Sequence, residues 1–364
     1  MRYAVIMAGG SGLRLWPMSR NTLPKQLIPF IAGRSLLESA AARLEGLIPP
    51  ERRYICAGQA HREAILRALP GWSADGYLGE PVGRDTVNAA GFCAAVIARR
   101  DPDAVIAVFT ADHLIEPVDE FQRIVSNGYA LVEQHPDTLL TFGIAPDTPS
   151  TAYGYLELGE ELGSGARRVS RFHEKPNPEA ARKYFEAGPD CYLWNSGMFV
   201  WRAATLLDCL FRYEPETHGL LMQIAEAWDK PSRQAVLERI YPGLKKTSVD
   251  YAVMEPASRD PLVRVAALPM RLRWLDVGSW PMYARTLAED DRGNAVAGAK
   301  ALVQDSRNTL VASSDPNHLV TVLGCRDLIV IHTPDATLVC SRSEAEAIKK
   351  LHELVRRRFG DEYV

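Results

Sequence analysis

The chain has 364 residues, of which 47% are hydrophobic and 24% charged, and its formal net charge is -3. These values are typical of a globular protein with a substantial core and room for two domains, and they give no overall field that would attract nucleic acid. No apolar run approaches the ~18 residues of a membrane-spanning helix, and the N-terminal apolar run is too short for a signal peptide.

The cysteines and histidines indicate no disulfide framework and no metal-ligand pattern. The cysteines lie in apolar or mixed contexts without a C-x-x-C pair, at Cys56, Cys93, Cys191, Cys209, Cys325 and Cys340. We expect buried, reduced thiols and therefore a cytoplasmic protein. The histidines show no metal-ligand spacing, so we expect most of them, His113 included, to be surface or hydrogen-bonded loop residues.

Strands and helices are expected to alternate through the first 110 residues. Apolar runs predict buried strands at residues 2–8, 53–57 and 104–110. Helical spacing predicts helices at residues 36–47, 61–69 and 86–100, the last with Asp85 or Thr86 as its N-cap. This alternation predicts an α/β fold with a Rossmann-like, mostly parallel sheet, whose ligands lie beyond the carboxyl ends of the strands.

The pattern of the chain changes near residue 294. Before it, we expect a strand around residues 195–201 and a helix at residues 222–240. After it, "NTLVAS", "HLVTVLG", "DLIVIHT" and "ATLVCS" are short strands with no helix between them. A closing helix is expected behind a capping box of Ser343 and Glu346. We therefore expect one domain at residues 1–290 and a small β-rich module at residues 291–364.

The segment "VIMAGGSGLRLWPMSRNTLPKQL", residues 5–27, is suited to phosphate binding. Its glycines let backbone N–H groups approach a phosphate closely. The dinucleotide fingerprint lacks its third glycine here, and the Gly-Lys-Ser/Thr triplet of a P-loop does not follow. Arg14 can hold phosphate oxygens in a bidentate way, and Lys25 adds a point charge. A tight turn with a surface arginine is the simpler alternative.

This segment resembles the opening signature of the sugar-phosphate nucleotidylyltransferases. The form with Trp16, Ser19 and Pro24-Lys25-Gln26 is similar to the mannose-1-phosphate guanylyltransferases among them. The resemblance implies the nucleotide-diphospho-sugar transferase fold, with Arg14 and Lys25 as catalytic residues. It also implies nucleotide contacts at Ala8, Gly9, Gly10 and Gly12.

A second segment, "GEPVGRDT" at residues 79–86, is similar to the part of the family that contacts the base. The resemblance implies nucleotide contacts at Glu80, Gly83, Arg84 and Asp85, the last in place of the family's asparagine. Glu80 or backbone carbonyls could accept the donors of guanine, and the sequence does not choose between them. The simpler alternative is a local salt bridge between Arg84 and Asp85 before a helix.

Two aspartates are candidates for a metal site. Asp112 follows a buried strand in "TADH", and Asp276 lies in "RWLDVGSW". The resemblance implies that both hold Mg2+, which prefers oxygen ligands and one or two carboxylates. Taken alone, an aspartate after a strand is more often a helix cap or a turn residue than a metal ligand.

Three further segments resemble the family's sugar-binding parts: "AYGYL", "FHEKP" and "LWNSGMFVW". The resemblance implies sugar-phosphate contacts at Gly154, Glu174, Lys175, Asn195 and Gly197. In "SVDYAVME", Asp250 and Glu255 are either groups that support this site or surface charges of a helix.

The implied reaction converts GTP and mannose 1-phosphate into GDP-mannose and pyrophosphate. A phosphate monoester is mostly dianionic at pH 7, so its attack requires no general base. We expect in-line attack without a covalent enzyme intermediate. The last ~70 residues resemble a β-helix-like module that often packs against another subunit, which implies a homodimer. The added isomerase domain of longer relatives is not expected.

Three alternatives compete with this reading. The first is a sibling enzyme that uses another sugar 1-phosphate with dTTP, UTP or ATP. The second is a non-catalytic regulatory subunit that binds sugar nucleotides, which retention of the metal pair disfavours. The third is a nucleotide-binding oxidoreductase, which the missing third glycine disfavours.

Overall fold

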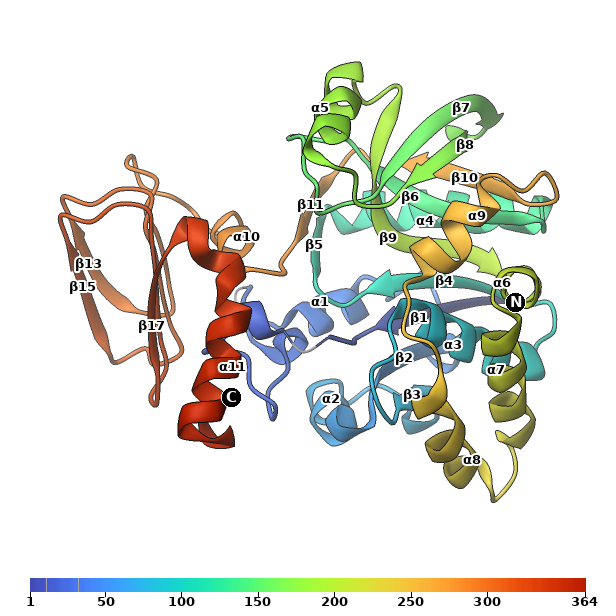
Figure 1. Cartoon of the computed structure of the whole chain (residues 1–364), viewed down its shortest axis with the longest axis horizontal. Helices are drawn as coiled ribbons and strands as arrows, with labels where there is room; N and C mark the ends of the chain where they lie inside the picture. The colour runs from blue at the N-terminus through green and yellow to red at the C-terminus, as the bar shows by residue number, and fades with distance from the viewer. Residues whose placement is uncertain (11, 32) are drawn as a thin grey trace. The chain divides into compact units, whose positions relative to one another are not determined.

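The computed structural model describes residues 1–10, 12–31 and 33–364, so Ser11 of the glycine loop and Ala32 lie outside the described residues. The chain forms two compact units (Figure 1). Unit 1 comprises Met1–Gly9, Ala41–Thr110 and Ile115–Arg273. Unit 2 comprises Gly10–Ala40, Ala111–Leu114 and Trp274–Val364. By contact, the glycine loop thus falls in the same unit as the C-terminal residues, and the domain boundary near residue 290 stays a prediction.

Unit 1 is built on one nine-stranded sheet with the order β3-β2-β1-β4-β9-β6-β10-β8-β7. Its strands are β1 (Arg2–Met7), β2 (Arg53–Gly58), β3 (Tyr77–Glu80), β4 (Val105–Thr110), β6 (Thr138–Ile144), β7 (Tyr155–Gly163), β8 (Ala166–His173), β9 (Tyr192–Arg202) and β10 (Arg264–Pro269). β1 pairs in parallel with β2 and β4, β2 with β3, and β6 with β10. β9 runs antiparallel between β4 and β6. The Rossmann-like, mostly parallel sheet is therefore confirmed.

Helices cover this sheet because their apolar faces match its buried strands. They are α2 (Arg62–Ala68), α3 (Thr86–Arg100), α4 (Val118–Gln134), α5 (Pro178–Ala187), α6 (Ala203–Tyr213), α7 (Pro215–Ala227), α8 (Arg233–Ile240) and α9 (Glu255–Ala257), which follows a π-helical turn, η7 (Asp250–Met254). α3 packs against α6 and α7. Among the described residues, no helix has both the length and the apolar character needed to cross a membrane.

Two expectations about local structure are wrong. The single helix predicted at residues 222–240 is two helices, because Pro231 lies in the intervening turn and cannot donate a backbone hydrogen bond. The helix predicted at residues 36–47 is α1 (Leu36–Ala42), and its later residues form turns that end in Gly46, which has a φ of 76°. The six cysteines are free thiols, but only Cys56, Cys93 and Cys209 are buried as expected. Cys325 and Cys340 are half-buried, and Cys191 is exposed because it lies in the turn before β9.

Unit 2 contains the predicted β-rich module. Its strands are β12 (Ala295–Ala297), β13 (Lys300–Gln304), β14 (Leu310–Ser313), β15 (Leu319–Leu323), β16 (Leu328–His332) and β17 (Thr337–Ser341). β12, β14 and β16 stack in parallel register, and β13 pairs in parallel with β15. Successive parallel strands joined by short turns are the arrangement of a β-helix, so the β-helix-like module is confirmed.

The glycine loop and the C-terminal module share one apolar core. The shared cluster includes Leu15, Phe30, Trp280, Leu310 and Ile329. Unit 2 also contains the short helices η1 (Leu13–Leu15), η2 (Lys25–Leu27), α10 (Trp280–Ala284), η8 (Arg342–Ala347) and α11 (Ile348–Phe359). Segments from both ends of the chain are thus held together by burial of apolar surface.

Hydrogen bonds reinforce this packing. The indole of Trp16 donates to the backbone carbonyl of Tyr363 at 2.7 Å, and Arg20 donates to the same carbonyl at 2.6 Å. Arg20 also pairs with Asp335 at 2.7 Å. Two residues from the segment 5–27 therefore bind the C-terminal backbone.

Candidate active site

The glycine loop leaves β1 in a conformation that depends on glycine. Gly10 has a φ of 97° and Gly12 a φ of 63°, a region that side chains with a Cβ adopt only under strain. An ideal Cβ on Gly12 would lie only 2.6 Å from Cβ of Lys25. Gly12 thus lets Lys25 pass close to the loop. Ala8 is buried and its N–H donates to Cys56, so this N–H is already used within the sheet.

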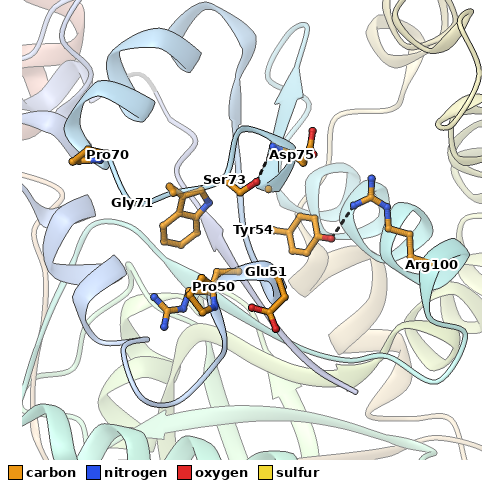
Figure 2. Close-up of a pocket in the computed structure, with 11 residues that line it drawn as sticks. Pro50, Glu51, Tyr54, Pro70, Gly71, Ser73, Asp75 and Arg100 are labelled. Carbon is orange, nitrogen blue, oxygen red and sulfur yellow. Dashed lines mark hydrogen bonds between the residues drawn. The ribbon is translucent and has the colours of Figure 1, made fainter.

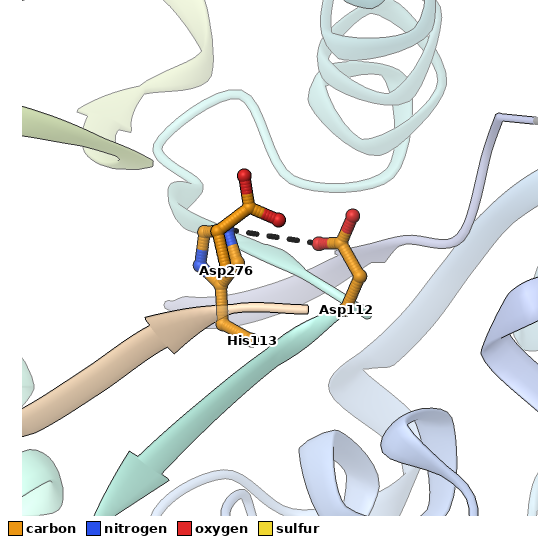
Figure 3. A group of neighbouring side chains, drawn as sticks. All are labelled: Asp112, His113 and Asp276. Carbon is orange, nitrogen blue, oxygen red and sulfur yellow. Dashed lines mark ion pairs between the residues drawn. The ribbon is translucent and has the colours of Figure 1, made fainter. Parts of the chain in front are cut away.

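Asp112 and Asp276 lie together in unit 2, although they are far apart in the sequence. Figure 3 shows both carboxyl groups with the ring of His113 beside them, and one ligand atom from each residue lies within 4.8 Å of the others. Asp112 lies just before the strand β5 (His113–Glu116), and Asp276 ends β11 (Arg273–Asp276), which pairs with β5. Strand pairing therefore brings the two carboxylates to one place.

Lys25 compensates the charge of this pair. Its ammonium forms an ion pair with Oδ2 of Asp112 at 2.5 Å. Burial favours the neutral form of Asp112, but the adjacent Lys25 and His113 outweigh it and hold the pKa of Asp112 well below its usual range. Burial and the charge of Asp112 raise the pKa of Asp276. Burial would lower the pKa of Lys25, yet the two carboxylates raise it. The pair thus attracts cations strongly.

His113 is a member of this group, whereas the sequence predicts a surface or hydrogen-bonded loop residue. Its ring is buried, and Nδ1 accepts a hydrogen bond from the indole of Trp274 at 3.1 Å. The neutral ring then carries its hydrogen on Nε2, which lies 3.7 Å from Oδ1 of Asp112. The ring of His113 therefore lies beside the carboxylate, although this distance is too long for a direct hydrogen bond. Its position directly after Asp112 was the only sequence signal for this role.

Arg14 lies near the pair but binds elsewhere in this structure. Its Nη1 donates to both carboxylate oxygens of Glu346, at 2.9 and 3.2 Å. The expected capping box of Ser343 and Glu346 is wrong, because α11 begins only at Ile348, after the η8 turn, and has no side-chain cap. Glu346 instead pairs with a residue from the other end of the chain.

The segment expected to contact the base lies in unit 1. Tyr241 donates to the buried Glu80 at 2.7 Å, and burial raises the pKa of Glu80 despite this bond. Arg84 donates to the carbonyl of Pro242, and Asp85 caps α3 by accepting from the N–H of Thr86. Each side chain thus has a partner other than the local Arg84–Asp85 salt bridge that we considered.

The glycines near this segment differ in their surroundings. An ideal Cβ on Gly9 would lie 3.9 Å from Oε2 of Glu80, so the end of the first strand and Glu80 are close together. A Cβ on Gly83 would meet nothing within 4 Å. Close approach requires glycine at neither position, because 3.9 Å is an ordinary van der Waals distance for a Cβ and the space at position 83 is open.

The residues expected to bind the sugar also gather in unit 1. Asn195 donates to Asp250 at 2.9 Å, while its amide oxygen accepts from Thr141 at 2.7 Å. Glu174 pairs with Lys175 at 3.0 Å, and an ideal Cβ on Gly154 would lie 2.5 Å from Oε2 of Glu174. The structure thus brings Gly154 next to Glu174 and fixes the orientation of the Asn195 amide.

Asp250 belongs to this group, which the sequence left undecided. It starts the π-helical turn η7, and such turns are frequent at functional sites. Burial and the nearby charge of Glu174 raise the pKa of Asp250 to about 7. Gly197 has a φ of 69° where the pairing of β6 and β9 is irregular, so β9 bends at this point. The irregularity lies inside the sheet, because β9 is flanked by β4 and β6.

A pocket of about 530 Å3 lies elsewhere in unit 1. Figure 2 shows Tyr54, which accepts a hydrogen bond from Arg100 at 3.1 Å, and Ser73, which accepts from the N–H of Asp75 at 3.2 Å. None of the residues expected from the sequence lines this pocket.

Comparison with known proteins identifies the family. The nucleotidyl transferase family model matches residues 3–293, and the model of the mannose-phosphate isomerase/GMP-like β-helix domain matches residues 300–356. A mannose-1-phosphate guanylyltransferase of Klebsiella pneumoniae is 36% identical over 100% of this chain and 76% of that relative. The xanthan biosynthesis protein XanB of Xanthomonas campestris pv. campestris is 34% identical over 95% of this chain and 72% of that relative.

A solved structure agrees over nearly the whole chain. The protein from Thermus thermophilus described as mannose-1-phosphate geranyltransferase is 30% identical, with a TM-score of 0.85 over 98% of this chain and 99% of that chain. The chain therefore belongs to the nucleotidyl transferase family of enzymes, and curated relatives of it within that family are mannose-1-phosphate guanylyltransferases.

Proposed function

We propose that this chain transfers GMP from GTP to mannose 1-phosphate and releases pyrophosphate. The relatives named for this activity support the choice of substrates. The observation that carries the chemistry is the partly buried pair of Asp112 and Asp276 with Lys25 beside it. Such a cation-attracting group suits a reaction in which two anions must meet.

Asp112 and Asp276 fit Mg2+ as its ligands. They offer carboxylate oxygens, which this ion prefers, and Lys25 already places one positive charge against Asp112. When bound, Mg2+ would offset the negative charge of the phosphates. His113, whose Nε2 lies 3.7 Å from Oδ1 of Asp112, would lie beside this ligand.

The other residues have roles that follow from their chemistry. Arg14 and Lys25 would hold the β- and γ-phosphates of GTP, together with N–H groups of the glycine loop. Lys175 would bind the phosphate of the sugar, while Glu174 and Asn195 would bind its hydroxyl groups. The sugar phosphate is itself the nucleophile, so attack on the α-phosphate would leave no covalent intermediate on the chain.

Recognition of the base is proposed for the residues of the second segment. Glu80 would accept a hydrogen bond from guanine, and Gly83, Arg84 and Asp85 would line the base with backbone and side-chain groups. Gly154 and Gly197 would leave room for the sugar ring. We also propose a cytoplasmic homodimer, which light scattering of the purified protein would test.

The decisive experiment measures pyrophosphate release with each of GTP, dTTP, UTP and ATP, combined with mannose 1-phosphate or glucose 1-phosphate in the presence of Mg2+. We expect GTP with mannose 1-phosphate to give the highest kcat/KM and GDP-mannose as the product. Preference for another pair would replace the proposal with a sibling enzyme. Binding of GDP-mannose without turnover of any pair would indicate a regulatory subunit.

A further inference from the structure

Glu346 holds Arg14 on one side only. Both carboxylate oxygens contact Nη1 of Arg14, at 2.9 and 3.2 Å. The guanidinium carries five N–H donors, so those of Nη2 and Nε are left for other acceptors. The η1 helix, which carries Arg14, packs against both η8 and α11. Glu346 therefore fixes the direction in which the remaining donors of Arg14 point.

The other side of Arg14 faces the carboxylate pair. An ideal Cβ on Gly278 would lie 3.3 Å from Nη2 of Arg14 and 3.1 Å from Oδ1 of Asp276. The two charged groups thus approach one point, which glycine leaves open. Arg14 nevertheless forms its ion pair with Glu346. Without Glu346, the guanidinium would be free to turn toward Asp276 and neutralise it.

The Arg14–Glu346 ion pair is expected to add little to the folding stability of the chain. The side chain of Arg14 is 44% exposed and that of Glu346 is 73% exposed. Ion pairs this exposed contribute little to folding stability, because water screens them. Glu346 also does not cap α11, because the N-cap residue of this helix is Ala347 and no side chain forms a cap hydrogen bond there. An effect of Glu346 should therefore appear in function rather than in folding.

We propose that Glu346 is a positioning residue for nucleotide binding, which holds Nη1 of Arg14 so that its other donors bind the triphosphate and Asp276 stays available. The role rests on the proposed function, in which Arg14 binds phosphates. It assigns to the C-terminal module a direct part in forming the phosphate site of unit 2.

The test is GTP binding measured by calorimetry without mannose 1-phosphate, so that no turnover occurs. We expect Glu346→Gln to raise the Kd for GTP about threefold to fivefold. Glu344→Gln removes the same charge from the same turn, at an exposed residue without an ion pair to Arg14, and should bind GTP like the parent. Both variants should melt within about 1 °C of the parent, as expected for exposed positions.

A double-mutant cycle separates positioning from a general charge effect. In an Arg14→Met background, Glu346→Gln should change the Kd for GTP no further, because its effect acts through Arg14. In steady-state assays the KM for GTP should rise by the same factor, while the KM for mannose 1-phosphate stays constant. Glu346→Asp keeps the charge and should restore part of the affinity.

Unchanged or tighter GTP binding by Glu346→Gln would overturn the proposal, as would an equal effect in the Arg14→Met background. These outcomes leave the proposed function untouched as long as the parent turns over GTP and mannose 1-phosphate. Conversely, a parent that binds GTP with the predicted cycle but turns over no sugar phosphate would refute the function and support the positioning role.

Discussion

The ammonium of Lys25 lies 2.5 Å from Oδ2 of Asp112, so a cation of the chain itself already neutralises one carboxylate of the partly buried pair. Burial and the charge of Asp112 raise the pKa of its neighbour Asp276, which means that a second negative charge there is unfavourable. A divalent cation and Lys25 would therefore compensate the same excess of negative charge.

Replacement of Lys25 tests this relationship. Lys25→Met should lower the free energy of unfolding by about 2 kcal/mol in EDTA, because it leaves Asp112 without its partner in a mostly buried place. Mg2+ should then raise the melting temperature of the variant more than that of the parent. Scanning calorimetry with and without Mg2+ measures both effects. Lys300→Met, at an exposed strand position, is the control, and equal Mg2+ shifts in all three proteins would contradict the expectation.

Neutralising Asp276 should separate stability from activity. Asp276→Asn should reduce kcat/KM at least about a hundredfold, while stabilising the metal-free protein by about 1 kcal/mol at pH 7 because it removes a like-charge contact. Because the pKa of Asp276 is raised in the folded chain, the folded chain keeps a proton that the unfolded chain has already lost. The free energy of unfolding of the parent should therefore fall as pH rises between the pKa of Asp276 in the unfolded chain and its pKa in the folded chain. This pH-dependent part of the free energy of unfolding should be absent from Asp276→Asn.

The check is chemical denaturation in EDTA over a pH series, alongside the pyrophosphate assay. Asp291→Asn removes an exposed carboxylate from the same unit and should change neither quantity. A less stable Asp276→Asn protein would show that the carboxylate is held by favourable contacts instead.

The conformation of the glycine loop can be tested by a matched pair of substitutions. Gly12→Ala and Gly33→Ala both place a Cβ at a positive φ, 63° and 78°, which costs about 1–2 kcal/mol. Only the Cβ at position 12 meets Lys25, at 2.6 Å, whereas that at position 33 meets nothing within 4 Å. Gly12→Ala should therefore lose more stability and also GTP affinity. If the two variants bind GTP equally, the passage of Lys25 past Gly12 is unimportant.

Titration of Asp250 should make the free energy of unfolding depend on pH near neutrality. Its pKa of about 7 lies above the unfolded value of ~3.9, so the native chain retains a proton between these values that the unfolded chain has released. Stability should fall as pH rises from 5 to 7, by about 1–2 kcal/mol from this residue. Asp250→Asn should flatten that part of the curve measured by urea unfolding, whereas Asp208→Asn, exposed on α6, should not. Parallel curves for parent and Asp250→Asn would disprove the assignment.

The periodic parts of the fold could be read from the sequence. Apolar runs predicted the central strands, and the change of pattern near residue 294 predicted the β-rich module. The antiparallel β9, inserted between β4 and β6, could not be placed in this way, because apolar periodicity does not specify the direction of a strand. Pro231 ended a predicted helix, although the residue was visible in the sequence.

Site residues could be predicted where they lie in a contiguous sequence motif. They were harder to predict where their contacts come from residues far away in the sequence. Asp112 and Asp276 were paired only through a resemblance, and the structure brings them together by pairing β5 with β11. Glu346 fits the sequence pattern of a capping box, but in the structure it accepts hydrogen bonds from Arg14, near the start of the chain, and caps no helix. Asp250 and His113 gain their surroundings from elements far away in sequence, which no local pattern encodes.

The apolar cluster around Trp280 has a practical consequence for dissecting this protein. It combines Leu15 and Phe30 from the first forty residues with Leu310 and Ile329 from the last seventy. The gap between the two family matches, at residues 293 and 300, therefore divides the sequence at a place where the interior is continuous. A fragment that ends there would expose apolar surface around the glycine loop and should aggregate, so the two matched regions are expected to fold as interdependent parts.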